Sequence, residues 1–174
     1  MRGYFGIGAE RISKAMNLGT LMRTAHAFGA SFAFVIDATY AVRQAKSDTS
    51  EAAGQMPIYD VPDAASLVLP KKCRLVGIEL TDDAVDLPSF RHPRQAAYVL
   101  GPERGELSPD LQARCDHVVR IPTRFCVNLG VAGAIVMYDR LVSLGRFAER
   151  PVRPGEPDAA APPHRHGNPR RRLP

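Results

Sequence analysis

The run Leu100-Gly101-Pro102-Glu103-Arg104-Gly105 combines residue types that can hold a ligand. It follows an apolar stretch over 96–100 that is typical of a buried strand. Gly101 lets a ligand approach the backbone closely, and Glu103 places a carboxylate where the carboxyl ends of strands usually present ligands. Taken alone, the run predicts either a binding loop or an ordinary turn with a surface carboxylate.

Asn17, Gly19 and Arg23 lie near the start of an expected amphipathic helix that ends at Gly29. Arg23 lies off the apolar face of that helix, so its side chain is expected to be exposed. An arginine can bind a phosphate through two parallel hydrogen bonds and so hold a neighbouring hydroxyl in place for reaction. A solvated helix charge is the alternative for Arg23 when it is considered alone.

A third segment of interest begins at Ile121 and leads into the last apolar stretch of the chain. Ile121-Pro122 ends a strand expected over 117–121, and Cys126-Val127-Asn128 precedes a helix expected over 128–147. Asn128 is an ordinary N-cap candidate. Because the helix has no charged residue from 129 to 137, it must be covered on all sides, by the sheet, by a dimer interface, or by both.

The remaining elements fit one α/β domain. Further strands are expected at 4–7, 31–36, 58–61 and 74–78, and a helix capped by Asp63 is expected over 63–69. The segments 38–55 and 80–94 are expected to be loops, the first with one helical turn. This alternation predicts an α/β fold: a mainly parallel sheet with helices on both faces.

Composition divides the chain into a domain, 1–149, and a basic tail, 150–174, which is rich in proline and arginine and is predicted to be disordered. Such a tail is either a solvated extension or an arm that binds phosphates. The three cysteines lack a CxxC spacing, so no disulfide framework or metal site is expected. No signal-peptide or membrane-span pattern occurs, and the expected location is the cytoplasm.

In this order, over residues 17 to 144, the three segments resemble the SpoU/TrmH family of RNA 2′-O-ribose methyltransferases, a branch of the SPOUT superfamily. The resemblance implies S-adenosylmethionine as cofactor, RNA as substrate with tRNA preferred over rRNA, a homodimer, and a C-terminal trefoil knot. It implies no metal and no membrane. It also implies site residues: Arg23, Asn17, Glu103 and Asn128 as the catalytic set, and Glu79, Leu100, Gly101, Ile121, Val127 and Asn128 for the cofactor.

The chain departs from the family at two positions, because Cys126 and Gly130 stand where the family has serines. This concerns substrate handling more than cofactor binding. Three alternatives stay open: a non-catalytic RNA-binding protein on the same fold, an rRNA 2′-O-methyltransferase, and a knotted methyltransferase that acts on a base nitrogen. The Asn17 and Arg23 pair speaks against the last, which would need a carboxylate base aimed at the ring.

Overall fold

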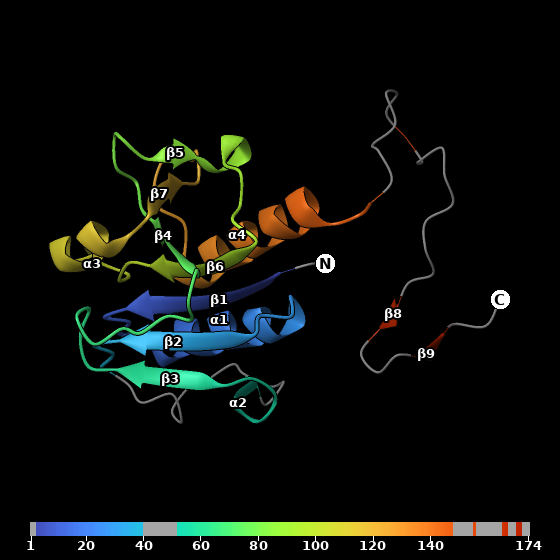
Figure 1. The fold of residues 1–174 in the computed structure, drawn as a ribbon, viewed down its shortest axis with the longest axis horizontal. Coiled ribbons are helices and arrows are strands. Elements are labelled where there is room, and N and C mark those ends of the chain that lie inside the picture. Colours follow the sequence, from blue (N-terminus) through green and yellow to red (C-terminus); the bar gives the residue numbers. More distant parts are fainter. Residues whose placement is uncertain (1–2, 40–51, 148–154, 156–164, 167–169, 172–174) are drawn as a thin grey trace.

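The computed structural model describes residues 3–39, 52–147, 155, 165–166 and 170–171, and its main feature is a seven-stranded sheet (Figure 1). The strands are β1 (Tyr4–Glu10), β2 (Phe32–Ile36), β3 (Ile58–Val61), β4 (Arg74–Ile78), β5 (Val85–Asp86), β6 (Gln95–Leu100) and β7 (His117–Arg120). They lie in the order β3-β2-β1-β6-β4-β7-β5, and every neighbouring pair is parallel. The prediction of a mainly parallel α/β sheet is confirmed.

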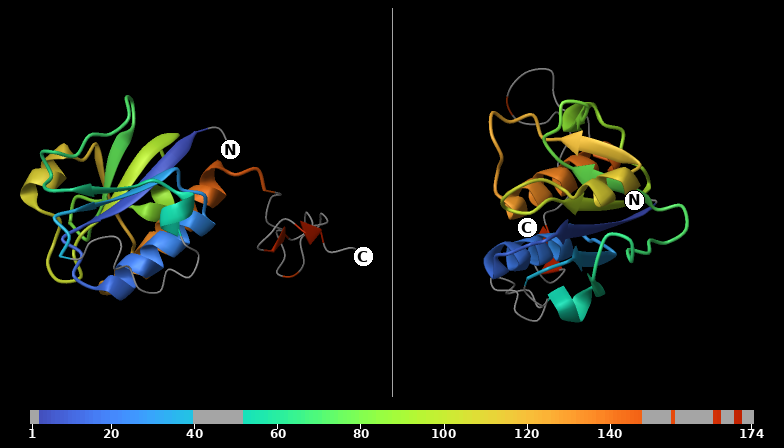
Figure 2. Two further views of the ribbon diagram at one scale, coloured as in Figure 1. Left: turned by 90° about the horizontal axis from the view of Figure 1, so that it is seen from below. Right: turned by 90° about the vertical axis from the view of Figure 1, so that its left-hand side faces the viewer.

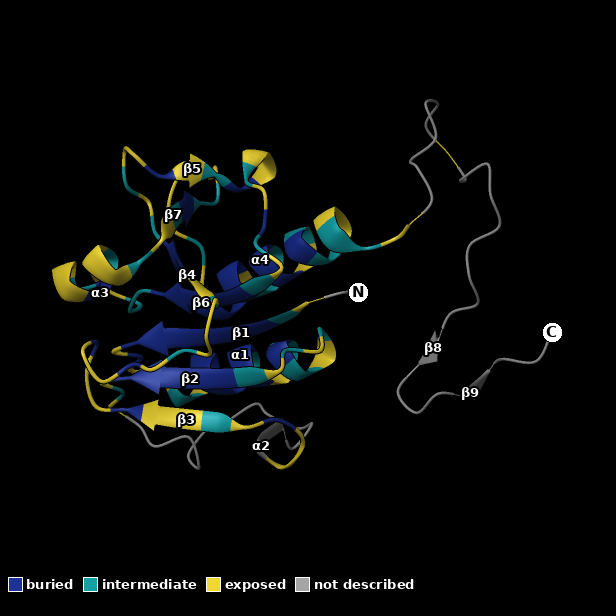
Figure 3. Ribbon diagram, viewed as in Figure 1, coloured by how far each residue is buried: buried dark blue, intermediate teal, exposed yellow. Residues whose placement is uncertain are grey.

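Helices cover the sheet unequally. The helices are α1 (Ala15–Ala27), α2 (Ala52–Gln55), α3 (Pro109–Arg114) and α4 (Leu129–Leu144). The long helices α1 and α4 pack side by side on one face, where the buried side chains of both join the main core (Figure 2). On the other face Leu111 of α3 packs in a second cluster with Leu75 and Val99. The central strands are therefore buried on both faces (Figure 3).

The prediction of a helix over 63–69 is wrong, because these residues form turns and irregular structure. The Asp63 carboxylate accepts a hydrogen bond from the backbone N–H of Ser66 (2.7 Å) and closes a local turn instead of starting a helix. Leu67 is buried in the second cluster, whereas Val68 is 88% exposed. Pro70 ends the segment before a helix of useful length can form.

The segment 80–94 also differs from the expected loop, because it contains β5 and a 3-10 turn over Leu87–Ser89. Strand β5 has two residues, which pair with Val119 and Arg120. Two residues are too few to give a periodic sequence signal. Of the other expected loop, 38–55, residues 52–55 form α2, and 40–51 lie outside the described residues.

A buried polar network fixes α4 to the segment before β6. His92 hydrogen-bonds through one ring nitrogen to Tyr98 Oη (2.6 Å) and through the other to Asp139 (2.8 Å). Arg140 is buried and donates to the carbonyl oxygens of Pro93 (2.6 Å) and Arg94 (2.9 Å). Burial lowers the pKa of His92, although the Asp139 carboxylate opposes this effect.

Most of the predicted tail, 150–174, lies outside the described residues, so its disorder stays a prediction. Its described residues include β8 (Arg165–His166) and β9 (Arg170–Arg171), which pair antiparallel. Within the described ranges, no helix is both long and apolar enough to cross a bilayer.

Candidate active site

A pocket opens at the carboxyl ends of the central strands. From β1 the chain builds outward to β2 and β3, whereas β6 and β4 lie on the other side of β1, so the topology switches between β1 and β6. In parallel sheets, ligands bind at the carboxyl ends of strands beside such a switch point. The pocket is lined by Ile78, Glu79, Leu80, Leu100, Gly101, Pro102, Glu103, Gly105, Ile121, Thr123, Cys126, Val127, Leu129 and Ala132.

Side chains from the three sequence segments meet beside this pocket in one hydrogen-bonded chain. Asn17 donates through Nδ2 to Glu103 Oε1 (3.0 Å) and accepts through Oδ1 from Asn128 Nδ2 (3.0 Å). Asn17 is buried, although it is polar. A buried amide with both ends bonded fixes the relative positions of its partners. The contacts therefore join the loop after β6, helix α1 and the start of α4.

The Glu103 carboxylate is saturated with donors. One oxygen accepts from the backbone N–H (3.0 Å) and hydroxyl (2.9 Å) of Ser13, and the other accepts from the Lys14 N–H (3.1 Å) and from Asn17. Burial raises the pKa of Glu103, but these hydrogen bonds outweigh that effect and leave the pKa below its usual value. The carboxylate therefore stays charged and holds the turn that precedes α1.

Asn128 caps α4, as the sequence indicated. Its Oδ1 accepts from the backbone N–H groups of Gly130 (2.9 Å) and Val131 (3.4 Å). The glycine at 130 has a steric reason, because a Cβ there would lie 2.7 Å from Cγ2 of Thr20 on α1. Close approach of α1 and α4 thus explains why a serine is absent at this position. Cys126 is exposed and lines the pocket.

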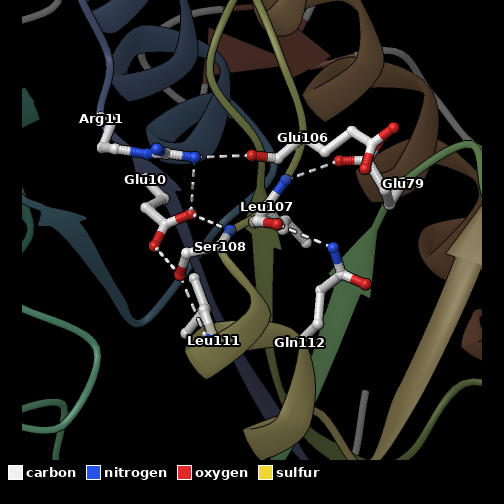
Figure 4. Close-up of polar contacts among 8 residues, drawn as sticks. All are labelled: Glu10, Arg11, Glu79, Glu106, Leu107, Ser108, Leu111 and Gln112. Carbon is white, nitrogen blue, oxygen red and sulfur yellow. Dashed lines mark hydrogen bonds and ion pairs between the residues drawn. The ribbon is translucent and has the colours of Figure 1, made fainter.

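Two further carboxylates tie down the loop over 101–108, as Figure 4 shows. Glu10, buried at the end of β1, accepts from both the backbone N–H and the hydroxyl of Ser108. Glu79, at the end of β4, accepts from the Leu107 N–H (2.9 Å), and Arg11 donates to the Glu106 carbonyl (2.7 Å). The role of Glu10 was not predicted from the sequence. The signal was an acidic residue ending an otherwise apolar strand.

Five of the residues expected to bind the cofactor, namely Glu79, Leu100, Gly101, Ile121 and Val127, line the pocket. Asn128 lies beside it, bonded to Asn17. Arg23 lies on α1, exposed and outside the pocket lining. The predicted roles of these residues stay predictions.

The sequence profile of the SpoU rRNA methylase family matches residues 5–138, a span that contains the pocket and the Glu103–Asn17–Asn128 chain. The chain belongs to this SpoU family. The family match covers β1 through most of α4.

Similar proteins agree with this assignment. The chain is 30% identical over 141 residues to a mouse (Mus musculus) protein, the tRNA (guanosine(18)-2'-O)-methyltransferase TARBP1, and covers 75% of its own length but 9% of the mouse protein. Its fold matches the SpoU methyltransferase AviRb from Streptomyces viridochromogenes in complex with the cofactor AdoMet, with a TM-score of 0.71 and 24% identity, over 84% of this chain and 60% of that one. It also matches the A. aeolicus TrmH/SpoU tRNA modifying enzyme, with a TM-score of 0.68 and 18% identity, over 80% and 74% of the two chains. At these identities the structures show a shared fold.

Proposed function

We propose that this SpoU-family chain binds S-adenosylmethionine in the pocket and transfers its methyl group to a ribose 2′-hydroxyl of RNA, with tRNA as substrate. The observation that carries the proposal is the Glu103–Asn17–Asn128 chain, which joins all three family segments beside the pocket. The tRNA named for the mouse relative supports tRNA over rRNA.

The pocket suits this cofactor chemically. Its walls are largely apolar, as an adenine ring needs, and two carboxylates, of Glu79 and Glu103, line it and favour a positively charged sulfonium. A Cβ at Gly101 would lie 3.0 Å from the Glu79 carboxylate and 3.2 Å from the Leu107 nitrogen, so a side chain there would press on the contact between Glu79 and the loop over 101–108. When bound, the cofactor supplies an electrophilic methyl group.

The chain's own residues then orient the substrate. In this proposal Arg23, which is exposed on α1, binds a phosphate of the RNA and so holds the ribose for attack. We assign Glu103 to positioning rather than to accepting the hydroxyl proton, because its oxygens already accept four hydrogen bonds and its pKa is lowered. By bonding to Ser13, Lys14 and Asn17, Glu103 fixes the position of the start of α1. It thereby also fixes the position of Arg23, which lies on the same helix.

The proposal includes a homodimer, a C-terminal trefoil knot and a cytoplasmic location. In support of the dimer, Val131, Tyr138 and Val142 of the largely apolar helix α4 are exposed on the single chain. The knot rests on membership of the SpoU family. Free thiols at all three cysteines suit a reducing compartment.

Calorimetry with S-adenosylmethionine and its demethylated product, followed by mass analysis of nucleosides from treated tRNA, tests the proposal. We expect binding of both ligands and one ribose-methylated nucleoside. Methylation on a base would refute ribose specificity. RNA binding without any cofactor binding at millimolar concentration would leave a non-catalytic RNA-binding protein.

A further inference from the structure

Charge is unevenly distributed between the two ends of the strands. At the carboxyl ends, carboxylates and cations are mixed: Glu10 ends β1, Asp37 follows β2, Asp63 follows β3, Glu79 follows β4, and Glu103 and Glu106 follow β6, while Arg11, Lys14 and Arg104 lie beside Glu103. RNA is a polyanion whose affinity for proteins comes largely from phosphate contacts. An edge that mixes both signs of charge attracts an RNA backbone less than an edge that carries mainly cations.

The opposite, amino ends of the strands carry basic side chains. Lys71, Lys72 and Arg74 lead into β4, Arg94 precedes β6, and all four are exposed. Register places them together, because Arg74 pairs with Ala96 and Tyr4 pairs with Gln95. We refer to Lys71, Lys72, Arg74 and Arg94 as the amino-edge basic surface.

The amino-edge basic surface contains a shallow pocket, and few carboxylates lie close enough to neutralise its positive charges. A shallow pocket lies between the two segments and is lined by Gly3, Lys72, Arg74, Pro93, Arg94 and Gln95. Within the described part of the chain, the only carboxylate in ion-pair range of the four cations is Asp116, 2.6 Å from Arg74. Lys72 has a left-handed backbone (φ 67°), a conformation that is uncommon for a residue with a side chain.

We propose that the amino-edge basic surface binds the phosphate backbone of the RNA substrate at a distance from the reacting ribose. The inference rests on the proposed function, which makes RNA the substrate. Strand β1 has seven residues and spans roughly 20 Å between the two ends. A folded RNA such as tRNA is large enough to contact both ends at once, whereas a free nucleotide is not. A structured RNA is therefore the ligand this surface favours.

The test compares two double variants, each of which loses two positive charges. Lys72→Gln/Arg94→Gln changes the proposed surface, and Arg114→Gln/Arg120→Gln changes cations outside it, on α3 and β7. Fluorescence anisotropy with labelled unfractionated tRNA gives affinity at several salt concentrations. Thermal unfolding confirms that both variants fold, and calorimetry measures their binding of S-adenosylmethionine.

We expect the Lys72/Arg94 variant to bind tRNA about tenfold more weakly at 0.1 M salt, with a salt slope smaller by roughly 1 to 2. Its kcat at saturating tRNA and its cofactor affinity should be unchanged. Equal affinities for this variant and wild type, or equal weakening in both double variants, would overturn the inference. A wild-type protein that binds tRNA but methylates none would refute the proposed function, and loss of binding in the Lys72/Arg94 variant alone would still support the surface.

Discussion

Replacing Glu103 by glutamine should leave the fold intact and slow methyl transfer while cofactor affinity stays within a few-fold. The carboxylate accepts two hydrogen bonds on each oxygen, from Ser13 on one side and from Lys14 and Asn17 on the other. In glutamine, one of the two carboxylate oxygens is replaced by an NH₂ group. This group is itself a donor, so it cannot accept the hydrogen bonds that the lost oxygen received. The Ser13 hydroxyl can rotate to accept, but the Ser13 backbone N–H cannot.

The cost follows from this geometry. One backbone bond to a charged acceptor is lost, and the bonds that remain lose their charge assistance. Bonds to charged groups contribute about 1.5–3 kcal/mol and neutral ones about 0.5–1.5 kcal/mol, and the site is partly exposed. Glu103→Gln should therefore lower the free energy of unfolding by about 1–3 kcal/mol, measured by urea denaturation. Glu106→Gln is the matched control, because the Glu106 side chain is exposed and Arg11 donates to the backbone carbonyl of Glu106, which the substitution keeps.

Kinetics separate positioning from proton transfer. If Glu103 only positions α1, single-turnover methyl transfer should fall while the shape of its pH–rate profile is kept. If Glu103 accepts the hydroxyl proton, the rate should fall by about 10²–10⁴ and the acid limb of the profile should disappear. That second outcome, or a Glu103→Gln protein as stable as the Glu106→Gln control, would refute our reasoning.

Four other changes have defined outcomes. Arg23→Ala should abolish methyl transfer and leave S-adenosylmethionine affinity within a few-fold by calorimetry; retained turnover would rule out an essential Arg23. Light scattering should report a homodimer, and Val142→Glu on the exposed side of α4 should shift it toward monomer; a wild-type monomer at micromolar concentration contradicts the dimer. Deleting 150–174 should leave cofactor binding and melting unchanged and weaken tRNA binding mainly at low salt; a much lower melting temperature would mean that the tail is packed. Because the pKa of His92 is lowered in the fold, the folded state resists its protonation, so stability is lost as pH falls through about 6.5, by at most about 1.4 kcal/mol per pH unit. Urea unfolding of His92→Gln should show a weaker acid dependence than wild type, and an identical dependence would contradict this account.

The elements that could be predicted from sequence are those whose signal is local. Dense apolar runs gave β2, β4 and β6, and the side chain of Asn128 caps α4 as expected. The turn at Asp63 was mistaken for a helix because its side chain can satisfy either structure.

What could not be predicted depends on distant pairing. Strand order is set by contacts between residues far apart, and β5 has no signal of its own. The same holds within the site. Family resemblance named Glu103 and Asn17, but only the fold shows that one bonds to the other, and that Glu10 holds the far end of the same loop.

The place of β6 between β1 and β4 has a consequence for how the protein is made. Tyr4 pairs with Gln95, so the central strand of the sheet leaves the ribosome about ninety residues after its neighbour β1. Until then β1 and β4 both present an open edge, and pairing them directly would build a sheet that must come apart again. Such non-local closure is slow and exposes chains to aggregation. Since Asn128 bonds to Asn17, 111 residues earlier, the candidate site itself is completed only when nearly the whole domain has been synthesised.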